Sequence, residues 1–96
     1  MFTKKDSLAA KNGKMKVSIL DRFAICYQDG DKKRTFGYEP LFDIEKPIYC
    51  VIIKGSYHWD APFDSEAITK EQLTIIKKHI TDALTILGVK AIIDDE

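Results

Sequence analysis

The 96-residue sequence has few of the residues that metal, phosphate and membrane sites require. It has two histidines and two cysteines, in no His-x-x-x-His or Cys-x-x-Cys spacing typical of a zinc site. Its five glycines are dispersed, so no phosphate-binding loop is formed, and Ser56 stands outside any Gly-x-Ser-x-Gly elbow. No apolar run approaches the roughly 20 residues of a membrane helix. We therefore expect no metal, no cofactor and no membrane span.

Composition predicts one globular domain over residues 1–96. Hydrophobic residues make up 45% of the chain and charged residues 31%, values far from those of disordered proteins. The N-terminus lacks the apolar core of a signal peptide, so we expect a cytoplasmic protein. Cys26 and Cys50 both lie in apolar strand-like segments and are predicted to be buried thiols.

Most of the chain has strand patterns. Residues 48–53 are six consecutive apolar residues, which predicts a strand buried on both faces. Asp29-Gly30 marks a hairpin turn because glycine accepts the positive φ that this turn needs. Residues 41–44 are either a continuation of the strand before them or a short separate strand. The other predicted strands are residues 15–20, 23–28, 33–38 and 89–93.

Residues 69–87 predict the one long helix. Thr69 and Gln72 have the spacing of a capping box, and Gly88 suits a left-handed C-terminal cap. Apolar residues recur at helical spacing: Leu73, Ile76, Ile80, Ala83, Leu84 and Leu87. We predict an α+β fold in which an antiparallel sheet of about four to six strands carries this helix on one face and ends in a closing strand.

Residues 1–14 are ambiguous. Residues 4–11 favour a short helix ended by Asn12-Gly13, a loose arm, or an edge strand near Phe2. The pattern does not choose between these three.

The segment 57–64 joins the apolar strand to the helix and contains Trp59, the only tryptophan. We expect Trp59 to fill the gap between helix and sheet, with its indole N–H bonded to a backbone carbonyl; the alternative is an exposed anchor for a partner. Asp60 and Asp64 have the chemistry for acid–base work, but capping a turn or facing solvent is the more common role of such residues. His79 lies at the edge of the apolar stripe, which is typical of a structural histidine.

Net charge is zero but unevenly distributed. Residues 1–34 carry nine basic and four acidic side chains, whereas residues 35–96 carry six and eleven. The lysines of the first third are not interleaved with aromatic residues, so nucleic-acid binding is weakly supported.

The stretch from Lys16 to Ile93 resembles bacterial immunity proteins of polymorphic-toxin and contact-dependent growth-inhibition systems, in particular the immunity protein 74 family. The resemblance lies in the strand 49–53, the motif Trp59-x-x-Pro62-Phe63-Asp64 and the helix opening at 68–72. It implies an α+β protein that is not an enzyme. Its partner would be the C-terminal domain of a cognate toxin, and outside that complex we expect a monomer.

Many toxins of these systems are nucleases with cationic clefts, which an acidic surface can occupy. Residues 39–66 carry six acidic and two basic side chains. The candidate contact residues are Asp43, Glu45, Asp60, Asp64 and Glu66, while Trp59, Pro62 and Phe63 are expected to mark the fold. The competing hypothesis is a small ligand-binding or enzymatic domain that uses a cleft at Trp59–Asp64.

Overall fold

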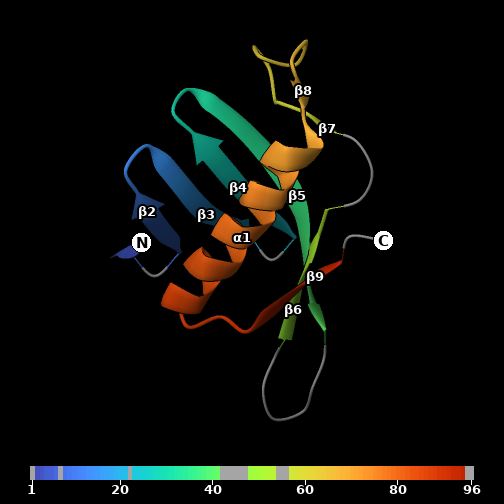
Figure 1. Ribbon diagram of the computed structural model, residues 1–96. Helices are drawn as coiled ribbons and strands as arrows, with labels where there is room; N and C mark the ends of the chain where they lie inside the picture. Colours follow the sequence, from blue (N-terminus) through green and yellow to red (C-terminus); the bar gives the residue numbers. More distant parts are fainter. Residues whose placement is uncertain (1, 7, 22, 42–47, 54–56, 95–96) are drawn as a thin grey trace.

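The computed structural model describes residues 2–6, 8–21, 23–41, 48–53 and 57–94, with the side chains of residues 40 and 41 omitted. One helix packs on a curled sheet of seven strands, and two further short strands form a separate hairpin (Figure 1). The α+β fold is thus confirmed. The elements are β1 (Thr3–Asp6), β2 (Ala9–Asn12), β3 (Met15–Asp21), β4 (Ala24–Asp29), β5 (Lys32–Leu41), β6 (Ile48–Ile52), β7 (Tyr57–His58), β8 (Ala67–Ile68), α1 (Lys70–Ile86) and β9 (Ala91–Asp94).

The large sheet has the strand order β1-β2-β3-β4-β5-β6-β9. Neighbours from β1 to β6 are antiparallel, and β9 then returns parallel to β6 after the chain has passed through α1. The six antiparallel strands β1–β6 and the closing strand β9 agree with the predicted sheet in number, but the closing strand pairs parallel and not antiparallel. A helix between two neighbouring strands of one sheet brings the second strand back in the same direction.

The first two strands come from the ambiguous N-terminus. Strands β1 and β2 pair antiparallel with each other, so the helical alternative was wrong and the edge-strand alternative was right. Ala9 and Ala10 are buried against the sheet, and β2 pairs with β3 over its whole length. Tertiary pairing overrides the helix preference of an alanine- and lysine-rich segment.

Helix α1 matches its prediction closely. Gln72 N donates to Thr69 Oγ1 (3.1 Å) and Thr69 N donates to Gln72 Oε1 (2.9 Å), which completes the capping box. Leu87 is the C-cap, and Gly88 takes a φ of +75° that suits glycine. The predicted stripe is buried at Leu73, Ile76, Ile80, Ala83 and Leu84.

The core lies between α1 and the concave face of the sheet (Figure 1). Its fully buried side chains include Val17, Ile25, Tyr27, Val51, Ile80 and Leu84. Burial of β6 on both faces is only partly observed, because Cys50 and Val51 are buried but Ile52 is half-buried. Cys26 is likewise half-buried rather than buried. The face of the sheet away from α1 is thus less buried than the apolar run of residues 48–53 predicts.

Candidate functional site

The segment 57–68 projects beyond the large sheet as the β7–β8 hairpin (Figure 1). Trp59 N donates to Glu66 O (3.2 Å), so the two arms of the hairpin stay paired beyond the strands. Asp60 N donates to Lys33 O (2.7 Å), which attaches this segment to β5. This segment, here called the junction, is therefore held in place by hydrogen bonds, and it leads directly into the N-terminal cap of α1.

Asp60 is the anchor of the junction. Its Oδ2 accepts hydrogen bonds from Thr35 N and Thr35 Oγ1, both at 3.1 Å. Its Oδ1 lies 3.4 Å from an Arg34 guanidinium nitrogen. Three donors on one carboxylate hold the hairpin against β5, which is a structural role that the sequence did not single out.

The five candidate carboxylates are in three different situations. Asp60 is bonded to β5, and Glu66 forms an ion pair with Lys32 at 2.6 Å. Asp64 is exposed to solvent. Asp43 and Glu45 lie outside the described residues. Among the candidate carboxylates that the structure describes, Asp64 alone is thus open to a partner without rearrangement.

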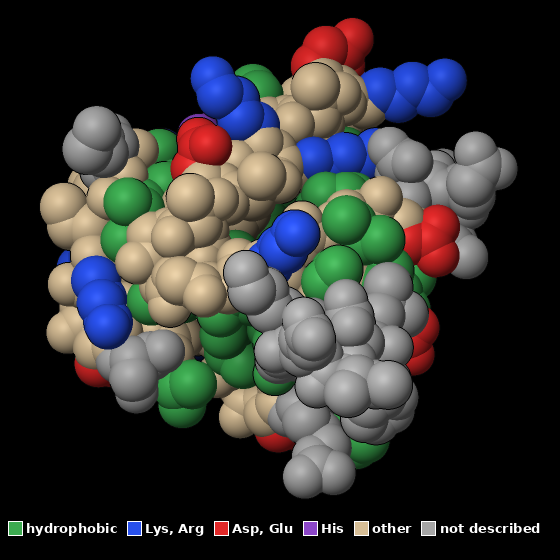
Figure 2. All heavy atoms as spheres, turned by 90° about the horizontal axis from the view of Figure 1, so that it is seen from below, with side chains coloured by type: hydrophobic (Ala, Val, Ile, Leu, Met, Phe, Trp, Pro, Cys, Tyr) green, Lys and Arg blue, Asp and Glu red, His purple; other side chains and the backbone are tan. Residues whose placement is uncertain are grey.

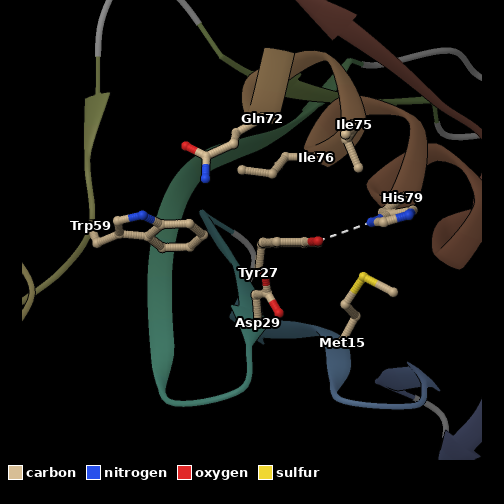
Figure 3. A pocket seen from close by; sticks show the side chains of 8 residues that line it. All are labelled: Met15, Tyr27, Asp29, Trp59, Gln72, Ile75, Ile76 and His79. Carbon is tan, nitrogen blue, oxygen red and sulfur yellow. Dashed lines mark hydrogen bonds between the residues drawn. The ribbon is translucent and has the colours of Figure 1, made fainter. Parts of the chain in front are cut away.

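The three motif residues also differ. Trp59 is 3% exposed, Phe63 is half-buried against the core, and Pro62 is exposed. The expected burial of Trp59 is confirmed, but the expected hydrogen bond is not: its Nε1 is buried with no partner in the described part of the chain. The indole nitrogen lies on the edge of the ring turned toward Gln72 (Figure 3), and the Gln72 oxygen is already engaged by Thr69 N.

A pocket of about 110 Å³ lies beside Trp59 (Figure 3). Its walls come from β3, β4, the junction and α1, segments that are far apart in the sequence. The lining residues are Met15, Tyr27, Asp29, Trp59, Gln72, Ile75, Ile76 and His79. Asp60 and Asp64 do not line it, so of the cleft expected at Trp59–Asp64 only Trp59 takes part.

Tyr27 and His79 form the polar pair of this pocket (Figure 3). The Tyr27 hydroxyl lies 2.9 Å from His79 Nδ1, and the two rings are nearly parallel at 6.0 Å. Burial, together with the negative charge of Asp29, raises the pKa of Tyr27 to about 12. The hydroxyl is therefore protonated at neutral pH and able to donate to His79. His79 is half-buried and lies within hydrogen-bond distance of this hydroxyl.

Asp29 brings negative charge to the pocket. Its Oδ1 is buried and has no hydrogen-bond partner among the described residues. Lys14 Nζ forms an ion pair with it at 3.4 Å, but that lysine side chain is 73% exposed. Two of the residues that line the pocket thus carry a buried polar atom without a hydrogen bond: the donor Trp59 Nε1, and the acceptor Asp29 Oδ1, which has the ion pair with Lys14.

A larger hollow of about 360 Å³ lies under the end of α1, lined by Leu8, Ile19, Leu20, Asp21, Tyr38, Tyr49 and Val89. Hydrophobic side chains are exposed on the lower side of the molecule (Figure 2). This hollow holds none of the buried atoms without a hydrogen bond. As a binding site, this hollow is therefore favoured by its volume alone, whereas the pocket beside Trp59 is favoured by its buried polar atoms.

Tyr27, Asp29 and Gln72 were not predicted as site residues. Tyr27 and His79 are 52 positions apart, and no local pattern links a strand residue to a helix residue at that distance. Among the described residues, no group of three or more His, Cys, Asp or Glu side chains is arranged to hold a metal ion. No helix of the described chain has the length and apolar character to cross a membrane.

Comparison with known proteins gave no match to a family model, to a curated protein or to a solved structure.

Proposed function

We propose that this protein is an immunity protein that binds a cognate toxin domain in the cytoplasm and occludes its active-site cleft. The toxin is a nuclease in this proposal, because a cleft built for phosphates is cationic and suits a carboxylate-bearing inhibitor. The motif Trp59-x-x-Pro62-Phe63-Asp64 supports the proposal through the family resemblance.

The observation that carries the proposal is the pocket beside Trp59. A buried polar group without a hydrogen bond costs about 1–3 kcal/mol. Trp59 Nε1 meets that description in the described chain, whereas Asp29 Oδ1 has the ion pair with Lys14 as its described partner. A partner that supplies an acceptor to the indole and a donor to the carboxylate removes the cost on binding, so the pocket favours an occupied state.

The size of the pocket favours a side chain of a protein over a metabolite. Small-molecule sites usually enclose about 300–1,000 Å³. A cavity of about 150 Å³ accepts a group the size of benzene. At about 110 Å³, this pocket fits one side chain inserted from a partner surface.

A basic side chain is the best match to the walls. Asp29 supplies the negative charge, and Trp59 and Tyr27 supply aromatic rings of the kind that attract a cation; Lys32 Nζ already lies 6.0 Å from the Trp59 ring centroid. Ile75 lines the pocket and is 52% exposed, which makes it the apolar rim. A lysine or arginine from the wall of a cationic cleft matches the charge, the aromatic rings and the apolar rim. Such a side chain carries only donors, so the acceptor for Trp59 Nε1 comes from a backbone carbonyl or another side chain of the partner.

The test uses the cognate toxin domain, to be sought first in the neighbouring gene, and a matched pair of helix variants. Ile75→Arg places charge at the rim of the pocket, whereas Ile86→Arg places it on the same helix at a residue 41% exposed and outside the pocket lining. We expect Ile75→Arg to weaken binding at least about tenfold and Ile86→Arg to change it less than about threefold. Equal affinities would remove the pocket from the interface.

Two conservative variants test the polar atoms. Trp59→Phe removes the indole N–H, and Asp29→Asn removes the charge; both keep most of the packing. We expect faster dissociation from the toxin domain with each, and a weaker salt dependence with Asp29→Asn alone. The wider claim fails if cells that produce the toxin domain gain no protection from the unmodified protein.

The acidic-surface mechanism is tested separately with Asp43→Lys/Glu45→Lys and with Asp64→Lys. Asp64 is exposed, and exposed charges contribute little to stability, so Asp64→Lys should leave the domain folded; thermal unfolding checks the fold of the double variant. Electrostatic steering is supported if the variants associate more slowly than the unmodified protein at low salt and the two association rates converge at high salt. Unchanged association removes those residues from the interface and leaves the pocket as the contact.

The second candidate is a small-ligand domain that uses the same pocket. The buried donor and acceptor favour a small ligand as much as they favour a protein partner. Only the small volume of the pocket argues against a small ligand. A screen of cationic and zwitterionic metabolites by thermal shift decides between them. A metabolite that raises the melting temperature, and loses that effect with Trp59→Phe, supports the small-ligand function.

A further inference from the structure

Strand β9 is the last strand of the large sheet, and its main chain has one side turned outward. Tyr49 N donates to Lys90 O and Ile53 N donates to Asp94 O, both at 2.9 Å. In a parallel ladder the groups that face the neighbour alternate along the strand, so positions 90, 92 and 94 face β6. Ala91 and Ile93 therefore direct their N–H and C=O groups away from it. Within the described chain, no strand pairs with that outer side.

The outer side of β9 lacks two of the features that usually protect a sheet edge, an irregular register and a charge or proline at its centre. Its register with β6 runs without a shift from Ala91 to Asp94. Its first three residues are uncharged and include no proline. Ile92 is 51% exposed on the face of the sheet away from α1. Such an edge is a template for another strand.

We propose that β9 pairs with β9 of a second copy of this chain, antiparallel, about a twofold axis at Ile92. The register follows from the hydrogen bonding. Ala91 and Ile93 are the outward-facing residues, and in an antiparallel pair such residues lie opposite each other. Centring the axis on Ile92 places Ala91 of each copy opposite Ile93 of the other, which forms four hydrogen bonds.

The side chains agree with this register. The two Ile92 side chains meet at the axis as a non-hydrogen-bonded pair, in which Cα atoms are about 4.5 Å apart and side chains are closest. Each therefore covers the other's exposed surface. Lys90 lies opposite Asp94 of the second copy, and by symmetry this pair of opposite charges occurs twice. A strand that is complementary to itself in backbone, apolar contact and charge fits a second copy better than an unrelated strand.

The contact is short, so the dimer is weak. Four residues a side bury far less than the roughly 1,600 Å² of a stable interface. We expect a dissociation constant on the order of 100 µM. This inference does not rest on the proposed function, and it replaces the expectation of a monomer with a monomer–dimer equilibrium.

Sedimentation equilibrium of the full chain from about 10 µM to 1 mM tests the proposal. We expect reversible dimerisation that Ile92→Lys weakens at least about tenfold, because it places two like charges at the axis. The matched control is Ile75→Lys, on α1, whose side chain has nearly the same exposure of 52%. A wild-type chain that stays monomeric to 1 mM overturns the proposal, as does equal dimerisation of the Ile92→Lys and Ile75→Lys variants.

A charge exchange tests the register. Lys90→Asp alone sets two acidic residues opposite each other, and Asp94→Lys alone sets two lysines opposite each other, so each variant should be monomeric. An equal mixture restores opposite charges at both ends and should dimerise. The thermal unfolding of each variant checks that the fold is intact. If the mixture of folded variants associates no more strongly than each variant alone, the proposed register and the twofold arrangement are both wrong.

Discussion

The two outer strands of the sheet, β1 and β9, have opposite edge chemistry. All four residues of β1 are exposed, two of them are the lysines Lys4 and Lys5, and its register with β2 shifts between Lys4 and Asp6. Strand β9 has an unbroken register and an exposed isoleucine, Ile92. Lysines and irregular pairing prevent a further strand from adding to an edge, and β9 has neither at its centre.

The difference shows that stability and association are set by different residues. Helix α1 contacts β1, β2 and β3 on one side and β9 on the other, so one core supports both edges. The residues that decide whether an edge accepts another strand lie outside this core. Substitutions in the core should therefore affect both edges alike, whereas substitutions at an edge should change association with little change in stability.

Ile80→Ala is expected to have the largest effect. Ile80 is fully buried in the stripe of α1, and such truncations cost about 2–5 kcal/mol. Amide exchange at β1 and β9 should accelerate together, since both edges pack on the same helix. Urea unfolding with Ile75→Ala as control, at a residue 52% exposed, checks this; the control should change stability by less than about 0.5 kcal/mol. Faster exchange at one edge only would show that the edges do not share a core.

Asp60→Asn should rank second. The substitution removes the charge from a carboxylate that accepts from Thr35 and Arg34, which we expect to cost about 1–3 kcal/mol. The junction is attached to β5, in the interior of the sheet, so the dimerisation at β9 should stay unchanged. The control is Asp64→Asn, because Asp64 is exposed. Equal melting temperatures for the two variants would contradict the anchoring role of Asp60.

The loss of stability at alkaline pH tests the two halves of the core separately, because each half contains one buried tyrosine with a raised pKa. Burial raises the pKa of both Tyr27 and Tyr38 to about 12, against an ordinary value near 10. The unfolded chain releases these protons near pH 10 and the folded chain retains them to about pH 12. Unfolding thus releases protons in this window, and stability falls as pH rises through it.

Tyr27 belongs to the half of the core near β1, through His79 and Phe2, whereas Tyr38 stacks on Tyr49 of β6, next to β9. Tyr27→Phe and Tyr38→Phe should each remove part of the decline between pH 10 and 12. Urea midpoints at pH 8, 10 and 11 measure this. A decline that is the same in both variants and in the unmodified protein would mean that neither tyrosine titrates as described.

The local elements of the fold could be predicted from the sequence. A capping box and an apolar stripe are encoded within one helix, and Asp29-Gly30 encodes its hairpin within four residues. Residues 3–12 could not be assigned, because their strand form depends on pairing with β3 and not on their own composition. The parallel pairing of β9 was missed for the same reason, since it depends on where α1 returns the chain.

The candidate site was less predictable than the fold. The burial of Trp59 follows from its place between strand and helix, but the pocket beside it joins residues from β3, β4 and α1. Charge counting along the chain overestimated the acidic surface, because Lys32 and Arg34 come from a basic stretch and pair with Glu66 and Asp60. Only the folded arrangement shows which carboxylates are neutralised.

The smallest effect on stability, and the sharpest test of the comparison, is expected from converting one edge into the other. Lys4→Ile/Lys5→Ile makes β1 read Thr-Ile-Ile-Asp, close to the Ala-Ile-Ile-Asp of β9. Both lysines are exposed, so stability should change by less than about 0.5 kcal/mol per position. Association should increase, because the charges that block the edge are gone.

The experiment is done in the Ile92→Lys background, where pairing through β9 is blocked, so that any association comes from β1. Sedimentation velocity should then show concentration-dependent association that Ile92→Lys alone lacks. The register shift between Lys4 and Asp6 remains in β1, so this association should be weaker than that of β9. If the triple variant stays monomeric, the irregular pairing protects the edge without the lysines, and the contrast between β1 and β9 is one of backbone geometry rather than charge.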